Sequence, residues 1–110
     1  MKDDLIFIKH ILESINAIEE FSKDIDKKEL KSNRLKQSAI VREIEIIGEA
    51  TKNISDSLKD KYPEIPWREI SGTRDKIIHN YFGVDLNIIW DIIKLNLPVL
   101  KKQLSNILKQ

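Results

Sequence analysis

The chain has 110 residues, of which 41% are hydrophobic and 34% charged, a composition that excludes a disordered segment and fits one folded domain over residues 1–110. It has no cysteine, which excludes disulfides and thiolate metal sites. With 19 basic and 18 acidic residues the net charge is +1, so there is no general field to attract nucleic acid, and any RNA must bind at a local patch or groove.

Three segments carry apolar residues at spacings of three and four, which predicts long helices over roughly 4–25, 34–58 and 86–109. The polar stretch between the first two is predicted to be a connection. Gly48 lies inside the second helix and indicates a close approach of another helix there. Pro98 lies inside the last one and is expected to distort it about one turn earlier, near Lys94.

Pro66 interrupts the helical pattern and is suited to start a short helix at about 66–71. We expect Thr73 to cap a further helix that Gly83 ends, and Asp85 to cap the last helix. Few glycines and prolines favour helices over a turn-rich sheet. The predicted fold is therefore all-α, an antiparallel bundle of about four main helices with a short extra one.

Arg74, His79 and Tyr81 stand within eight residues, in a chain with two histidines. A guanidinium can hold a phosphate, and an imidazole, with an ordinary pKa of about 6.5, can move a proton near neutral pH. Together they are sufficient to cleave RNA without a metal.

Helical spacing constrains this cluster. On one ideal helix Arg74 and Tyr81 share a face, whereas His79 is about 140° away from Arg74. Either Arg74 reaches around the helix or a second subunit completes the site. Asp75 precedes His79 by four residues, so its carboxylate is positioned to orient the imidazole.

Ordinary structural roles compete with each of these interpretations. An arginine and a histidine on a bundle helix are more often solvated or paired with carboxylates than catalytic. Tyr81 alone fits a core position with a polar tip, and His10 fits the surface. Trp67 and Trp90 are expected to be core or interface anchors rather than a base-stacking platform. Three glutamates of the second helix lack the partners that a metal site needs: Glu43, Glu45 and Glu49.

The string from Arg74 to Tyr81 resembles the Arg-x4-His-x-Tyr signature of the HEPN superfamily, specifically its HepT-type toxins. Flanking strings resemble the same family in the same order: Arg42–Ala50, Tyr62–Trp67 and Phe82–Asp85 followed by Trp90. The resemblance covers residues 42–90, and the flanking helices agree in length and placement.

This resemblance implies a HEPN-like fold and a homodimeric, metal-independent ribonuclease toxin of a toxin–antitoxin pair, with no cofactor. Arg74 would hold the scissile phosphate of an RNA such as a tRNA or mRNA, and His79 would act as general acid or base. An MntA-type nucleotidyltransferase antitoxin would silence the toxin by adenylylating Tyr81. The family often has asparagine after the arginine, where this chain has Asp75, a carboxylate that strengthens the orientation of His79 or repels RNA.

Two other functions remain open at this stage. An inactive helical dimer could bind a nucleotidyltransferase and serve as its substrate or platform, or the chain could be a purely structural dimer. The start of the chain lacks the apolar core of a signal peptide, and no run reaches membrane-spanning length. We therefore expect a cytoplasmic protein without a membrane partner.

Overall fold

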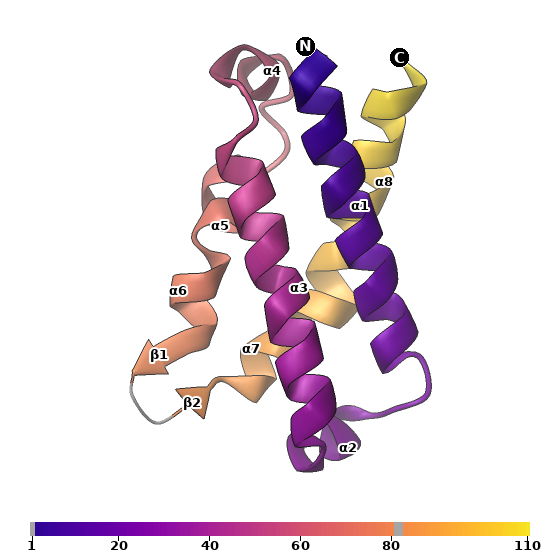
Figure 1. Cartoon of the computed structure of the whole chain (residues 1–110), viewed down its shortest axis with the longest axis vertical. Coiled ribbons are helices and arrows are strands. Elements are labelled where there is room, and N and C mark those ends of the chain that lie inside the picture. The colour runs from indigo at the N-terminus through magenta and orange to yellow at the C-terminus, as the bar shows by residue number, and fades with distance from the viewer. Residues whose placement is uncertain (1, 81–82) are drawn as a thin grey trace.

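Three long helical segments run side by side through the molecule, and a column of short elements lies beside them (Figure 1). A computed structural model of the chain describes residues 2–80 and 83–110. The two termini lie at the same end of the bundle in Figure 1. In chain order the elements are α1 (Lys2–Ser22), α2 (Lys27–Ser32), α3 (Arg34–Lys52), α4 (Asp56–Lys61), α5 (Trp67–Ser71), α6 (Thr73–Ile77), β1 (Ile78–Asn80), β2 (Gly83–Val84), α7 (Leu86–Asp91), the π-helical segment η1 (Ile92–Asn96) and α8 (Leu97–Lys109).

The core lies where the apolar stripes of α1, α3 and the last helix meet, which confirms the all-α prediction. Burying such stripes removes apolar surface from water and is the main stabilising contribution in a fold of this kind. The described residues include two short strands, which form one hairpin and do not change the class. Among the residues whose burial is described, the largest fully buried side chains are Ile8, Ile11, Ile15, Ile18, Leu30, Ile40, Thr51, Leu58, Ile77, Ile89 and Leu104.

The second predicted helix is shorter than the sequence suggested. Instead of reaching residue 58, α3 ends at Lys52, and a separate helix α4 follows. Ser55 caps α4, and Asp4 of α1 binds both the Ser55 backbone N–H, at 2.8 Å, and its hydroxyl, at 2.6 Å. The apolar period continues through the break because Ile54 is also buried, so periodicity alone could not find it.

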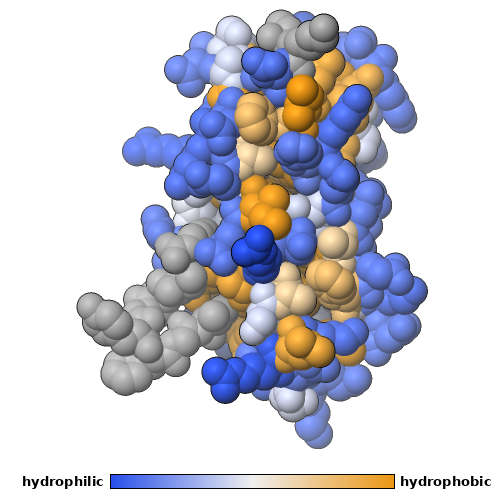
Figure 2. Space-filling model, in the orientation of Figure 1, coloured by the Kyte–Doolittle hydropathy of each residue, from blue (hydrophilic) through white to orange (hydrophobic). Residues whose placement is uncertain are grey.

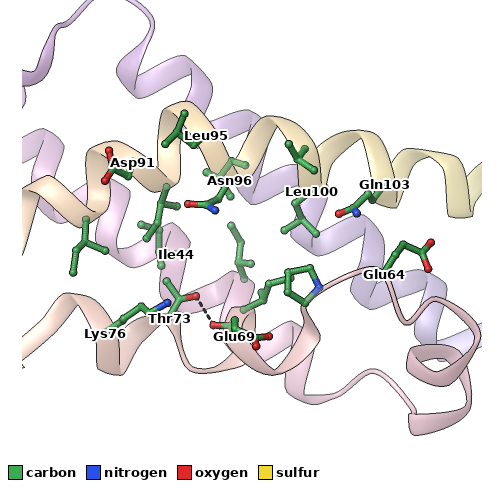
Figure 3. Close-up of a pocket in the computed structure, with 17 residues that line it drawn as sticks. Ile44, Glu64, Glu69, Thr73, Lys76, Asp91, Leu95, Asn96, Leu100 and Gln103 are labelled. Carbon is green, nitrogen blue, oxygen red and sulfur yellow. Dashed lines mark hydrogen bonds between the residues drawn. The ribbon is translucent and has the colours of Figure 1, made fainter.

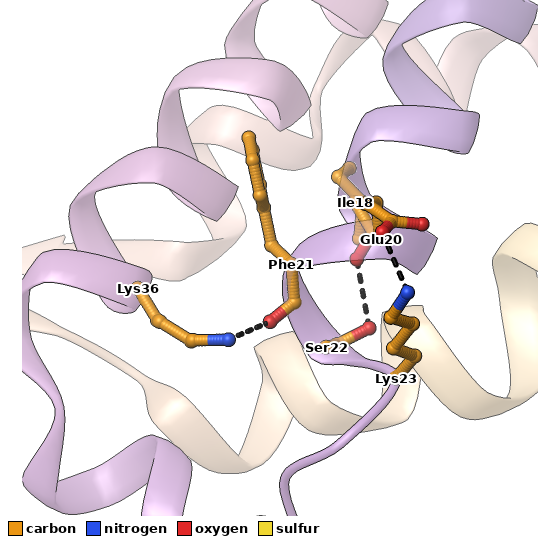
Figure 4. A network of polar contacts seen from close by, with 6 residues as sticks. All are labelled: Ile18, Glu20, Phe21, Ser22, Lys23 and Lys36. Atoms are coloured by element: carbon orange, nitrogen blue, oxygen red, sulfur yellow. Dashed lines mark hydrogen bonds and ion pairs between the residues drawn. The ribbon is translucent and has the colours of Figure 1, made fainter.

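The predicted connection between the first two long helices also contains structure. Leu30 of α2 is fully buried, although its neighbours are polar, and Asp26 caps that helix. Figure 4 shows how this end is closed: the Lys36 ammonium donates to the Phe21 carbonyl at 2.7 Å. Lys23 pairs with Glu20 at 2.7 Å, and this hydrogen bond raises the pKa of Lys23.

The last helix is distorted at the place that Pro98 predicts. Leu97 donates its N–H to Ile92, five residues back, so η1 has π-helical hydrogen bonds and Lys94 lies at its centre. Proline has no N–H to give to the carbonyl four residues earlier, and this missing donor favours a local change of register. The distortion predicted near Lys94 is therefore confirmed.

Within the described residues, no helix is long and apolar enough to cross a membrane. The face formed by α1 and α3 is mostly hydrophilic, with apolar side chains along the seam between the helices (Figure 2).

Candidate active site

The motif begins on α6, a helix of five residues that starts at Thr73 and ends at Ile77. Gly72 accepts backbone hydrogen bonds from Asp75, at 3.1 Å, and from Lys76, at 3.3 Å. The Thr73 hydroxyl donates to the Glu69 carbonyl at 2.9 Å, so Thr73 joins α6 to α5, and the prediction that it caps α6 is wrong. Ile77 is fully buried and anchors the C-terminal end of α6.

The chain leaves the helix after Ile77 and forms a hairpin, so the predicted helix to Gly83 is wrong. Strand β1 pairs antiparallel with β2, with Ile78 opposite Val84 and Asn80 opposite Gly83. Gly83 therefore belongs to a strand and does not end a helix. Adjacent β-branched residues favour extended backbone, and five helical residues are too few to hold a helix without tertiary support.

A hydrogen bond closes the base of the hairpin. The N–H of Asp85 donates to the Ile77 carbonyl at 2.9 Å, which joins the end of α6 to the start of α7. The Asp85 carboxylate then accepts from the N–H groups of Asn87, at 3.1 Å, and Ile88, at 3.2 Å. The predicted cap at Asp85 is confirmed, and it fixes the position of the hairpin relative to the last helix.

Arg74 and His79 therefore stand on two different elements, a short helix and a strand, that meet at buried Ile77. Their side chains, and all of Tyr81, lie outside the described part of the chain, so their roles stay predictions. Helical angles no longer relate these residues. Because His79 is on a strand, helical spacing no longer supports the prediction that Asp75 orients it. Asp75 itself is exposed, and its orienting role stays a prediction.

Close packing against α3 positions this region. A Cβ added at Gly48 would lie 3.5 Å from the carbonyl oxygens of Ile70 and Ser71, which confirms the predicted close approach. Trp67, buried in the core, donates its indole N–H to the Tyr62 carbonyl at 3.0 Å, as expected of an anchor. The α5 segment is therefore packed against α3 directly before α6 begins.

Beside α6 lies a groove of about 460 Å³, which the sequence did not reveal. One wall is formed by α5 and α6 and the other by α7, η1 and α8, with Ile44 of α3 between them (Figure 3). Thr73 and Lys76 line it, so the groove borders the helix that carries Arg74. Apolar side chains predominate in it: Ile44, Ile47, Ile70, Ile88, Ile92, Leu95, Leu97, Val99 and Leu100.

Charged groups lie along the rim of the groove. Lys76 and Asp91 are at one end and Glu64 at the other (Figure 3), with Glu69 on the wall between. In residues 2–80 and 83–110, no group of three or more histidines, cysteines or carboxylates is arranged to hold a metal ion. His10 is exposed on α1, as predicted, with its ring 6.3 Å from that of Phe7.

Comparison with known protein families identifies the family of this chain. The family model "Ribonuclease HepT-like" matches residues 11–107. The chain belongs to the HepT-like ribonuclease family. No solved structure shows a significant match to it.

Several relatives of this HepT-like chain are similar over nearly its whole length. "Putative RNase MJ1380" of Methanocaldococcus jannaschii is 42% identical over 94% of this chain and 95% of that protein. "Probable ribonuclease HepT" of Thermococcus cleftensis is 43% identical over 94% of each. "Gamma-glutamylcyclotransferase and putative RNase MJ0434" of M. jannaschii is 43% identical over 99% of this chain but 49% of that protein. The chain spans about half the length of that relative.

Proposed function

We propose that this HepT-like chain is a metal-independent endoribonuclease toxin that works as a homodimer in the cytoplasm. The observation that carries the proposal is the presence of an Arg-x4-His pair, Arg74 and His79, inside the family match over residues 11–107. The names of the relatives, which describe ribonucleases, support it.

The proposed chemistry needs one proton to leave and another to arrive. The ribose 2′-hydroxyl loses its proton and attacks the adjacent phosphorus, and the bond from phosphorus to the 5′-oxygen breaks as that oxygen is protonated. The imidazole of His79 serves one of these transfers, and its copy in a second subunit serves the other. The guanidinium of Arg74 stabilises the negative charge that develops on the phosphoryl oxygens.

In this proposal the partner is an MntA-type nucleotidyltransferase antitoxin that adenylylates Tyr81. Each adenylyl phosphodiester brings a negative charge and bulk close in sequence to Arg74 and His79. It therefore competes with an RNA phosphate for the same guanidinium. Silencing by this route requires no change of fold.

Two histidines in the chain provide a matched test. Wild-type protein whose intact mass shows no modification is incubated with a labelled tRNA pool in the presence of a chelator. We expect cleavage by wild type and by His10→Ala, and a fall on the order of 10²- to 10⁴-fold for His79→Ala at unchanged helical content. Cleavage by His79→Ala at the wild-type rate would refute the assignment.

The exposed carboxylate of Asp75, next to Arg74, favours a second candidate. An inactive dimer that binds a nucleotidyltransferase and serves as its substrate needs no attraction for RNA, in keeping with the net charge of +1. It predicts tight partner binding without cleavage of the tRNA pool. Recovery of cleavage in Asp75→Asn would show that the carboxylate repels the RNA and would return the assignment to the nuclease.

A further inference from the structure

A half-buried carboxylate of α3, that of Glu45, lies at the level of the helix that carries Arg74. Glu45 precedes Gly48 by three residues, and at Gly48 α3 packs on the carbonyl oxygens of Ile70 and Ser71. The segment from α5 to α6 runs antiparallel to α3, and α3 contacts both short helices (Figure 1). Three residues correspond to about 4.5 Å along a helix axis. Three residues back along α3 and three forward from Ser71 therefore reach the same level, at Glu45 and Arg74.

Helical angles place positions 45 and 74 on the same side of the contact between α3 and α6. Ile44 of α3 and Thr73 of α6 both line the groove (Figure 3). Positions 45 and 74 each come one residue later, about 100° around their own helices. Because the helices are antiparallel, these two rotations have opposite senses when viewed from one end, and both lead to the side of the contact away from the groove. Lys76, the other cation of α6, lines the groove and therefore lies on the opposite side.

The surrounding charges make Arg74 the best match for Glu45. Glu49, the next acidic residue of α3, is exposed and pairs with Lys52 at 3.8 Å. Arg42 stands one turn before Glu45 on α3, but Arg42 is exposed, whereas Glu45 is half-buried. A carboxylate that is partly withdrawn from water is stabilised as an ion by a guanidinium beside it. The antiparallel packing of α6 brings such a group to the level of Glu45.

We propose that Glu45 is a positioning residue whose carboxylate holds one edge of the Arg74 guanidinium and leaves the other edge to an RNA phosphate. A guanidinium has five N–H groups in one plane, and a carboxylate that accepts two of them leaves the others available. Held in this way, Arg74 loses less conformational freedom on meeting the phosphate, and its charge is directed at the oxygens on which negative charge develops. This inference rests on the proposed function, because it assigns a partner to the residue that is proposed to bind the phosphate.

The first test needs no RNA. Melting temperatures of full-length wild type, Glu45→Gln, Arg74→Gln and the double variant form a double-mutant cycle. We expect the double variant to lose about 2–4 °C less than the sum of the two single losses, because each single change already removes the pair. A matched cycle combines Glu45→Gln with Arg42→Gln, one turn away on the same helix, and its losses should add. Additive losses in the Arg74 cycle would overturn the proposal, whatever the Arg42 cycle shows.

The second test asks whether the pair serves cleavage as well as folding. Cleavage of a labelled tRNA pool is measured in single turnover with a chelator, at a temperature at which every variant is folded. Glu45→Gln should cleave on the order of 10- to 100-fold more slowly than wild type, and Glu45→Asp, which keeps the charge, should recover part of that loss. Glu49→Gln makes the same change at an exposed position of α3 and should cleave like wild type. A Glu45→Asp variant as slow as Glu45→Gln would overturn the positioning role of the charge.

Together the two tests separate this pairing from the nuclease itself. Coupled melting temperatures in a protein that cleaves no RNA would retain the pair of Glu45 and Arg74 and refute the proposed nuclease. Cleavage by wild type and by Glu45→Gln at the same rate would retain the nuclease and overturn the positioning role of Glu45.

Discussion

The long helices and the motif segment follow different rules, although their sequences have similar apolar spacing. In α1 the fully buried residues Ile8, Ile11, Ile15 and Ile18 recur every three or four positions, and the helix runs without a break. From Thr73 to Val84 the spacing also suits a helix, yet the chain forms one short helix and a hairpin. An apolar helical period produces a long helix only when a neighbouring element buries every turn of it. In the motif segment, Ile77 is the fully buried residue among the side chains that the structure describes.

A pair of equally buried isoleucines gives the largest expected effect and the clearest way to break this comparison. Ile15→Ala in α1 should lower the free energy of unfolding by about 2–5 kcal/mol, measured by urea denaturation, through lost burial and a cavity. Its cleavage rate per folded molecule should not change. Ile77→Ala should lower that rate as well, because Ile77 joins the elements of Arg74 and His79. If both variants keep the wild-type rate, the motif does not depend on this junction.

The cap at Asp85 offers a smaller effect that sharpens the same contrast. Asp85→Ala removes the acceptor for two N–H groups of α7 and should cost about 0.5–2 kcal/mol of unfolding free energy. Asp85→Asn retains a capping oxygen and should recover most of that loss. Equal losses in the two variants would show that the charge of Asp85, rather than its capping hydrogen bonds, is what matters there.

The hydrogen bonds between Asp4 and Ser55 lie away from the motif segment and are expected to have the smallest effect, about 1 kcal/mol of unfolding free energy. Burial alone would raise the pKa of Asp4, but the hydrogen bonds from Ser55 outweigh it and hold the pKa below the usual 3.8. The unfolded chain therefore binds this proton more readily than the folded one. The stabilisation is present above pH 3.8 and is lost as the pH falls through the lower folded value. Asp4→Asn should be less stable than wild type at neutral pH, and the gap in melting temperature should narrow as the pH falls below 3.8.

Much of the fold was predictable because its causes are local. The apolar stripes identify the three long helical segments, Pro98 indicates the distortion around Lys94, and Asp85 indicates the start of α7. The end of α3 was not predictable, since its cause is Asp4, which is 51 residues away from Ser55 in the chain. Leu30 was missed because a single apolar residue among polar ones carries no period.

The candidate site was likewise predictable only in part. Residue type and spacing were sufficient to single out Arg74, His79, Tyr81 and Asp75 as candidates, because the chemistry of an arginine or a histidine belongs to the residue itself. Only the tertiary structure showed that the backbone of Arg74 is on a helix and that of His79 on a strand, because a closing hydrogen bond between Asp85 and Ile77 selects the hairpin. The tertiary structure alone also revealed the groove. Its two walls come from segments about 20 or more residues apart in the chain, and a local sequence pattern does not predict such a surface.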